Sequence, residues 1–240
     1  MANHDSSIRP SDRRTSSSRP AAGLIREAAC GEVRGSLHVL TRLGVGAAEQ
    51  EVAMIDTEAL DEVLRTTEKI LGGVHTDQYA LPTPCPDYNV GTLVNHIVAW
   101  VSVFADGASG DKPHIDPASF KAGADPAAEF AASAQRLSAA FRDGAAERQI
   151  DLGNGASPGS MIFGMILMEY IGHGWDLAMA TDQPAPYSER SISAAKEAAE
   201  ANLKPEYRGP DKSFGDIVPV PDGAPPLDEL VGILGRTPHS

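Results

Sequence analysis

Residues 168–176 read Met-Glu-Tyr-Ile-Gly-His-Gly-Trp-Asp and place a carboxylate and an imidazole four positions apart in a mostly apolar segment. In an α-helix this spacing puts Glu169 and His173 on one face, about one turn apart. Another isolated histidine, His96, stands within the apolar segment of residues 93–100. Two imidazoles and one carboxylate are a donor set that a divalent metal takes when one coordination position stays open. The sequence therefore predicts a metal site formed by His96, Glu169 and His173.

The segments around these residues predict a helical protein. Apolar residues recur at helical spacing, and capping residues or glycines mark the ends of the segments. We expect helices over residues 56–73, 90–105, 126–143, 158–181, 189–203 and 226–235, a proline-rich non-helical segment over 79–88 and an extended tail over 214–221. Aromatic residues make up only 5% of the chain, which suits closely packed helices better than strands. The predicted fold class is all-α.

Three glycines, at positions 164, 172 and 174, fall within the predicted helix that carries Glu169. Glycine lowers helix stability, so its use here indicates the close approach of a neighbouring helix or of a ligand. The flanking apolar residues predict a largely buried helix, in which an unpaired carboxylate would cost several kcal/mol. A bound metal or a protonated state would relieve that cost at Glu169.

Composition excludes several partners. The formal net charge of −13 argues against a nucleic-acid partner, which requires clustered Lys and Arg. No apolar run reaches the roughly 18 residues of a membrane span, and the N-terminus lacks the apolar core of a signal peptide. These features predict a cytoplasmic protein with no membrane partner. Cys30 and Cys85 fall in segments of different character, so we expect no disulfide between them and a free thiol at Cys85.

The N-terminal part of the chain differs from the rest. Residues 1–53 are rich in Ser, Arg, Gly and Pro and show no apolar period, which predicts a disordered leader. A functional basic arm is the alternative. The helical bundle is expected over residues 54–240.

Four segments carry a resemblance to a known family, and they are residues 83–90 (TPCPDYNV), 93–96 (LVNH), 169–178 (EYIGHGWDLA) and 218–227 (VPVPDGAPPL). In this order they resemble the DinB-like superfamily of metal-binding four-helix bundles, within the actinobacterial branch related to the N-terminal domain of mycothiol-dependent maleylpyruvate isomerase. The resemblance implies a DinB-like four-helix bundle with an additional helix and an extended C-terminal tail. It also implies that His96, Glu169 and His173 hold the metal.

The sequence departs from the family pattern in two respects. Tyr88 stands where many relatives carry Trp, and we expect this change to alter packing more than chemistry. The maleylpyruvate isomerase has an additional C-terminal domain that is not expected here, so its substrate does not carry over.

Each candidate site residue also has a simpler interpretation. His96 could be a hydrogen-bonded core histidine, and Glu169 could form an ion pair on the helix surface. Asp176 lies three residues after His173, where it could orient the imidazole or bind a cofactor or ligand; the alternative is a charge at the rim of the bundle. Cys85 could be a reactive thiol near a helix start or a small buried turn residue.

The predicted donor set suits Zn²⁺, and Ni²⁺, Fe²⁺ and Mn²⁺ also accept it. The resemblance implies a transferase or isomerase in which the metal activates a low-molecular-weight thiol, with mycothiol as co-substrate and an electrophilic small molecule as substrate. A metal-dependent hydrolase would use the same ligands. A non-catalytic or stress-related metal-binding module is the third alternative, and a fourth ligand from His75, His114 or Asp176 would favour it. Bundles of this kind often pair through a helix face, so a homodimer is a further expectation.

Overall fold

The computed structural model describes residues 55–153, 155–209, 212 and 214–238, so the predicted leader lies outside the described residues. The α-helices are α1 Thr57–Gly72, α2 Val90–Ser109, α3 Pro126–Arg142, α4 Gly159–Ala180, α5 Glu189–Asn202 and α6 Pro226–Ile233. Short 3-10 helices lie at Thr76–Gln78, Ala145–Glu147 and Pro205–Tyr207. The predicted all-α class is confirmed.

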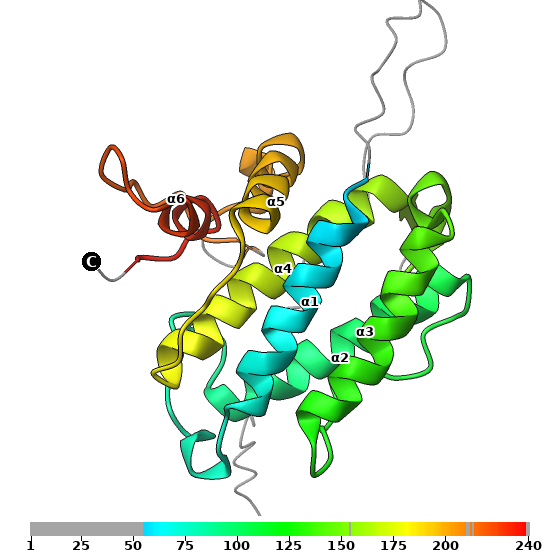
Figure 1. The fold of residues 1–240 in the computed structure, drawn as a ribbon, viewed down its shortest axis with the longest axis horizontal. Coiled ribbons are helices and arrows are strands. Elements are labelled where there is room, and N and C mark those ends of the chain that lie inside the picture. Colours follow the sequence, from blue (N-terminus) through cyan, green and yellow to red (C-terminus); the bar gives the residue numbers. More distant parts are fainter. Residues whose placement is uncertain (1–54, 154, 210–211, 213, 239–240) are drawn as a thin grey trace, which may run out of the picture.

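Four long helices form the bundle (Figure 1). Helices α1 and α2 each pack against both α3 and α4. Helix α5 lies on α4, and α6 lies on α5 (Figure 1). The expected four-helix bundle with an additional helix and a C-terminal tail is therefore confirmed.

The helix starts follow the capping residues of the sequence. The side chains of Asp56, Asn89, Asp125 and Ser188 each accept a hydrogen bond from a backbone N–H in the first turn of the helix that follows. Helix α2 runs four residues beyond the predicted end at residue 105. It ends where Gly110 adopts a left-handed conformation with φ of 85°.

A small hairpin was not predicted. Strands β1 Gln149–Asp151 and β2 Ala156–Pro158 pair antiparallel just before α4, in the segment between the helices predicted over 126–143 and 158–181. Three-residue strands contain too little alternation of polar and apolar residues to be recognised in a sequence.

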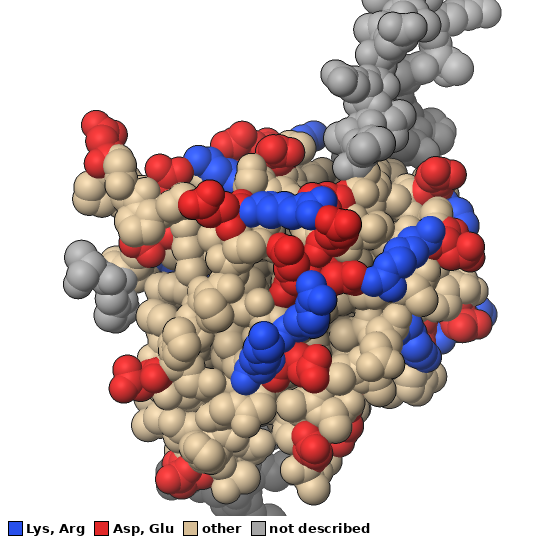
Figure 2. Space-filling model, viewed as in Figure 1, with Lys and Arg blue, Asp and Glu red and all other residues tan. Residues whose placement is uncertain are grey.

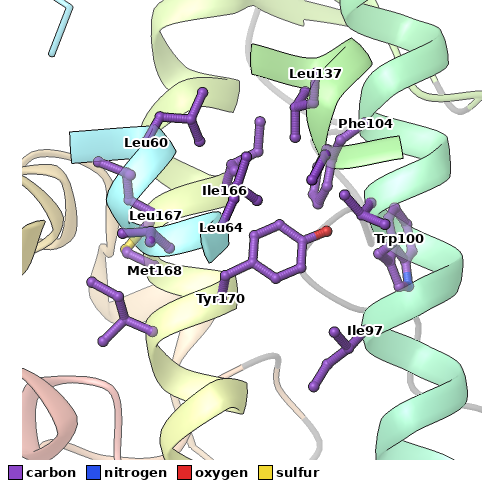
Figure 3. Packing of buried hydrophobic residues seen from close by; sticks show 14 of the residues in the cluster. Leu60, Leu64, Ile97, Trp100, Phe104, Leu137, Ile166, Leu167, Met168 and Tyr170 are labelled. Carbon is purple, nitrogen blue, oxygen red and sulfur yellow. The ribbon is translucent and has the colours of Figure 1, made fainter. Parts of the chain in front are cut away.

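Aromatic side chains fill the centre of the bundle between α2, α3 and α4 (Figure 3). The fully buried ring of Tyr170 on α4 meets Phe104 of α2 and Phe130 of α3 edge-on, at centroid distances of 6.2 and 5.4 Å. This core fixes α2 and α4 relative to each other, and these are the two helices that carry the predicted metal ligands.

The glycines of α4 lie where other parts of the chain come close, as expected. A Cβ atom at Gly174 would lie 1.8 Å from the hydroxyl oxygen of Tyr187, and one at Gly164 would lie 2.8 Å from the Cβ of Ala198. Side-chain-free positions therefore let α5 and the segment before it pack closely on α4.

Helix α2 has the length and hydropathy of a membrane span, but 83% of its apolar window is buried inside the bundle. It is therefore a core helix of the bundle.

Basic side chains on the face shown in Figure 2 alternate with acidic ones. Arg142 pairs with Asp61, and Arg190 pairs with Asp56 and Glu58. These local ion pairs neutralise the basic groups that they contain.

Candidate metal centre

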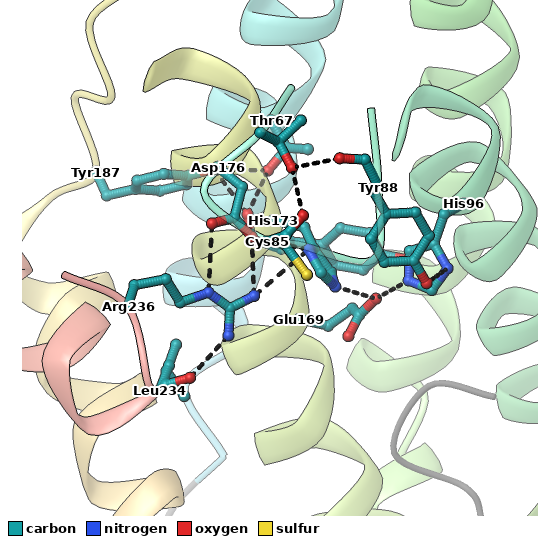
Figure 4. A network of polar contacts seen from close by, with 12 residues as sticks. Thr67, Cys85, Tyr88, His96, Glu169, His173, Asp176, Tyr187, Leu234 and Arg236 are labelled. Carbon is teal, nitrogen blue, oxygen red and sulfur yellow. Dashed lines mark hydrogen bonds and ion pairs between the residues drawn. The ribbon is translucent and has the colours of Figure 1, made fainter. Parts of the chain in front are cut away.

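The three predicted ligands lie together where α2 faces α4 (Figure 4). The Nε2 atom of His96 lies 2.7 Å from Oε1 of Glu169, and Nε2 of His173 lies 3.7 Å from the same oxygen. One ligand atom from each residue lies within 4.8 Å of those of the other two. The fold thus brings together side chains that are far apart in sequence, and metal binding by them stays a prediction.

The centre lies at the edge of the core. The side chains of His96, Glu169 and His173 are 8%, 9% and 11% exposed. Burial alone would raise the pKa of Glu169, but His173, His96 and Arg236 outweigh it and lower this pKa to about 2. Burial lowers the pKa of His96 and outweighs the opposite effect of Glu169. At neutral pH an ionised carboxylate therefore faces a neutral His96 imidazole.

Tyr88, from the segment before α2, contacts both histidines. Its hydroxyl lies 3.0 Å from Nδ1 of His96, and its ring centroid lies 4.8 Å from that of His96 and 5.6 Å from that of His173. Burial, with the nearby Glu169 carboxylate, raises the pKa of Tyr88, so the hydroxyl keeps its proton at neutral pH. The expectation that Tyr88 affects packing more than chemistry did not include this hydrogen bond to a predicted ligand, and it stays a prediction.

Asp176 lies behind His173 and not at the exposed rim of the bundle. Its side chain is fully buried, and Oδ2 lies 3.0 Å from Nδ1 of His173. Arg236 donates hydrogen bonds from Nη2 to Oδ2 at 2.8 Å and from Nε to Oδ1 at 3.3 Å. Burial would raise the pKa of Asp176, but Arg236 and His173 outweigh it and lower this pKa. The carboxylate is thus placed to hold the His173 ring, and cofactor binding by Asp176 stays a prediction.

Cys85 is a free, partly buried cysteine beside Asp176 and His173. Burial raises the pKa of its thiol to about 11, so the thiol is protonated at neutral pH. A metal bound by Cys85, His173 and Asp176 would also meet the guanidinium of Arg236, which already occupies both Asp176 oxygens. This second cluster suits a cation less well than the first.

Two of the three side chains considered as a fourth ligand lie elsewhere. His114 binds the buried Asp106 through Nδ1, and His75 precedes the 3-10 helix at Thr76–Gln78. Neither belongs to a cluster of metal-binding geometry within the described part of the chain.

The two Nε2 atoms and the Glu169 carboxylate of the first cluster fit a divalent metal. Both Nδ1 atoms are occupied from outside, by Tyr88 at His96 and by Asp176 at His173. Both Nε2 atoms therefore point to the shared Glu169 oxygen, and outer partners of this kind orient metal-binding imidazoles. Three protein ligands leave one tetrahedral position free for another molecule.

Sequence reasoning missed Arg236. Its position after α6 carries no motif, and the contact with Asp176 spans 60 residues. The sequence did indicate that Asp176 has no cationic partner nearby in the chain, because no Lys or Arg lies between Arg148 and Arg190. A buried Asp176 in that stretch needed a cation from elsewhere.

The fold is that of a DinB-like helical bundle. The chain belongs to the mycothiol maleylpyruvate isomerase N-terminal domain family, which residues 60–178 match. The matched segment contains Tyr88 and all three predicted ligands, whereas Arg236 lies beyond it.

Two relatives come from Mycobacterium tuberculosis. The uncharacterised protein Rv0738 of strain H37Rv is 34% identical over 173 residues, which make up 70% of this chain and 90% of the relative. The uncharacterised protein MT0763 of strain CDC 1551 gives the same values. No solved structure matches the chain significantly.

Proposed function

We propose that the protein binds a divalent metal, zinc in the first instance, through His96, Glu169 and His173. We further propose that the metal centre serves a mycothiol-dependent transferase or isomerase reaction. The observation that carries the first part is the convergence of two Nε2 atoms on one carboxylate oxygen, each ring being held from behind at Nδ1. Family membership supports the second part.

The protein's own residues would have distinct tasks. Glu169 supplies the only negative charge among the three ligands and offsets part of the metal charge. His96 and His173 are held by Tyr88 and Asp176, so little conformational entropy is lost when a metal binds. When bound, the metal would act as a Lewis acid that lowers the pKa of a thiol and makes the thiolate available as a nucleophile.

The chain need not provide a nucleophile for such a reaction. The nearest candidate, Cys85, has a pKa raised to about 11 by burial and is thus poorly nucleophilic at neutral pH. The attacking sulfur would come from the small-molecule thiol, and the partner would be an electrophilic small molecule. A reducing cytoplasm suits both a free Cys85 and a thiol co-substrate.

The test is a calorimetric titration of the zinc-loaded protein with mycothiol, with metal content measured by mass spectrometry. We expect saturable thiol binding that requires zinc and disappears in His96→Ala. His114→Ala is the matched control, because it removes a histidine outside the centre and should keep both zinc and thiol binding.

The other outcomes separate the alternatives. A stoichiometric metal without thiol binding would overturn the thiol-dependent reaction and favour a metal-binding module or a hydrolase. A wild-type protein that takes up no metal would overturn the site itself.

A further inference from the structure

A buried carboxylate near the C-terminal end of α2 holds two basic side chains. Asp106 is only 3% exposed, and its Oδ2 atom accepts hydrogen bonds from the backbone N–H and from Nδ1 of His114. Its Oδ1 atom accepts a hydrogen bond from Nη2 of Arg136 at 2.6 Å. Ten residues separate Asp106 from His96, which is about 15 Å along the helix. The cluster is therefore distinct from the proposed metal centre.

The carboxylate of Asp106 determines which nitrogen of His114 is free. Burial would raise the pKa of Asp106, but hydrogen bonds from Arg136 and His114 outweigh it, so this group is an ionised acceptor at neutral pH. A carboxylate only accepts hydrogen bonds, so neutral His114 carries its proton on Nδ1 and its lone pair on Nε2. The His114 side chain is 61% exposed, and Nε2 has no hydrogen-bond partner among the described residues.

This arrangement is that of a nucleophilic imidazole. In a Ser-His-Asp triad, a buried aspartate likewise holds Nδ1–H of a histidine and stabilises the positive ring that forms when Nε2 reacts. Among the described histidines, His96 and His173 are buried, and His75 is exposed but pairs with no carboxylate of the described residues. Within that part of the chain, His114 alone combines an exposed imidazole with a buried carboxylate partner.

Arg136 favours a phosphoryl group as the electrophile. Its side chain is 47% exposed, and Nη2 is the only atom for which the described residues provide a partner. The guanidinium lies beside the imidazole, because both bind the same carboxylate group. A guanidinium can donate two parallel hydrogen bonds to phosphate oxygens. The exposed neighbours Asp111 and Lys112 carry opposite charges, so they add no net repulsion.

We propose that His114 accepts a phosphoryl group on Nε2, that Arg136 binds the phosphoryl oxygens and that Asp106 is a positioning residue. The lone pair of Nε2 forms the new N–P bond. The bond between phosphorus and the leaving group of the donor breaks, and its electron pair departs with the leaving group. Nδ1 keeps its proton, and the Asp106 carboxylate offsets the positive charge of the ring. The donor is a small molecule that carries a phosphoryl group on a good leaving group.

The experiment uses phosphoramidate as the phosphoryl donor, with ammonia as its leaving group. The full-length protein is incubated with it at neutral pH, and peptide mass spectrometry without acid treatment measures the label on each histidine separately. We expect His114 to be labelled at least about tenfold faster than His75, a modest part of the effect of such an aspartate in a catalytic triad. His114→Gln should lose this label and stay folded, because the side chain is exposed.

Asp106→Asn tests the positioning residue. It should slow the labelling of His114 to the rate of His75 and leave the rate of His75 unchanged. Nitrogen-15 NMR at mildly alkaline pH gives a second measurement. We expect the proton of neutral His114 on Nδ1 in the wild type and on both nitrogens in exchange in Asp106→Asn, a change that lost stability alone would not cause.

Arg136→Gln tests the binding of the phosphoryl group. It should slow the labelling of His114 several-fold. Arg142→Gln is the matched control, because it removes an ion-paired arginine from the same helix and should leave the labelling unchanged.

Three results would overturn the proposal. They are equal labelling rates for His114 and His75, a wild-type His114 with its proton on Nε2, and an unchanged labelling rate in Arg136→Gln. The proposed metal site and its thiol reaction would stand in each case, because they involve none of these side chains.

Discussion

Arg236, which follows α6, donates two hydrogen bonds to Asp176 of α4, one to each carboxylate oxygen. Asp176 is fully buried, and the Arg236 side chain is only 11% exposed. A third N–H of the guanidinium donates to the carbonyl of Leu234. The C-terminal tail is thus tied directly to the residue that holds His173.

Replacing Arg236 by Gln should lower the free energy of unfolding by about 3–5 kcal/mol. The reason is that Asp176 would stay buried with its charge uncompensated, and removal of one partner from a buried ion pair costs about that much. Urea unfolding followed by circular dichroism measures the change.

Arg208→Gln is the control for this variant. Arg208 holds the same tail by donating to the carbonyls of Ile233 and Gly215, but it faces no buried carboxylate. We expect a loss of only about 0.5–1.5 kcal/mol. Equal losses in the two variants would show that Arg236 merely anchors the tail.

The contact between Gly174 and Tyr187 predicts a coupled pair of substitutions. Gly174→Ala should destabilise the protein by about 1–3 kcal/mol, since the new Cβ would overlap the Tyr187 hydroxyl. Tyr187→Phe removes that oxygen, so the double variant should lose less stability than the sum of the single variants. Strict additivity in a double-mutant cycle would contradict the predicted overlap.

The buried hydroxyl of Tyr170 predicts that its removal does not lower the free energy of unfolding. It has no hydrogen-bond partner within the described part of the chain and points into an aromatic core (Figure 3). Tyr170→Phe should therefore leave the free energy of unfolding unchanged or raise it by about 1 kcal/mol. Tyr187→Phe, which loses two hydrogen-bonding partners, should lower it. A clear loss in Tyr170→Phe would indicate a partner such as a buried water.

Asp106 predicts a dependence of stability on pH. Its burial would raise the pKa, but hydrogen bonds from Arg136 and His114 outweigh this and hold the pKa below its ordinary value of 3.8. A carboxyl with a lower pKa in the folded state stabilises the fold above about pH 4, and this stabilisation is lost as pH falls through the folded-state pKa. The stability gap between wild type and Asp106→Asn should therefore be full at pH 7 and shrink below pH 4.

Asp61→Asn is the comparison for that experiment. Asp61 pairs with Arg142, whose side chain is 55% exposed, so the pair should contribute little at either pH. A gap for Asp106→Asn that does not change between pH 7 and pH 3 would contradict the assignment.

Local signals predicted most of the fold. The caps at Asp56, Asn89 and Asp125 act within one helical turn, so the sequence alone marked where three bundle helices begin. The i and i+4 spacing likewise placed Glu169 and His173 on one face. The hairpin before α4 was missed because three-residue strands carry a weak pattern. The end of α2 was placed four residues too early, because the helix continues through Asp106 and Gly107 to its cap at Gly110.

The contacts that complete the site are not local. Arg236 reaches Asp176 only because α6 docks on α5, and Tyr88 reaches His96 only because its proline-rich segment folds back beside α2. No spacing rule connects such residues. The sequence could indicate that a buried carboxylate needs a partner, but not which side chain supplies it.

The most direct measurement is X-ray absorption at the zinc edge, made on the zinc-loaded protein before and after addition of mycothiol. We expect only nitrogen and oxygen neighbours at about 2.0–2.2 Å before addition, from two imidazoles and a carboxylate. After addition we expect one new sulfur neighbour at about 2.3 Å. Sulfur present before addition would make Cys85 a ligand and contradict the proposed ligand set. An unchanged spectrum after addition would contradict thiol binding at the metal.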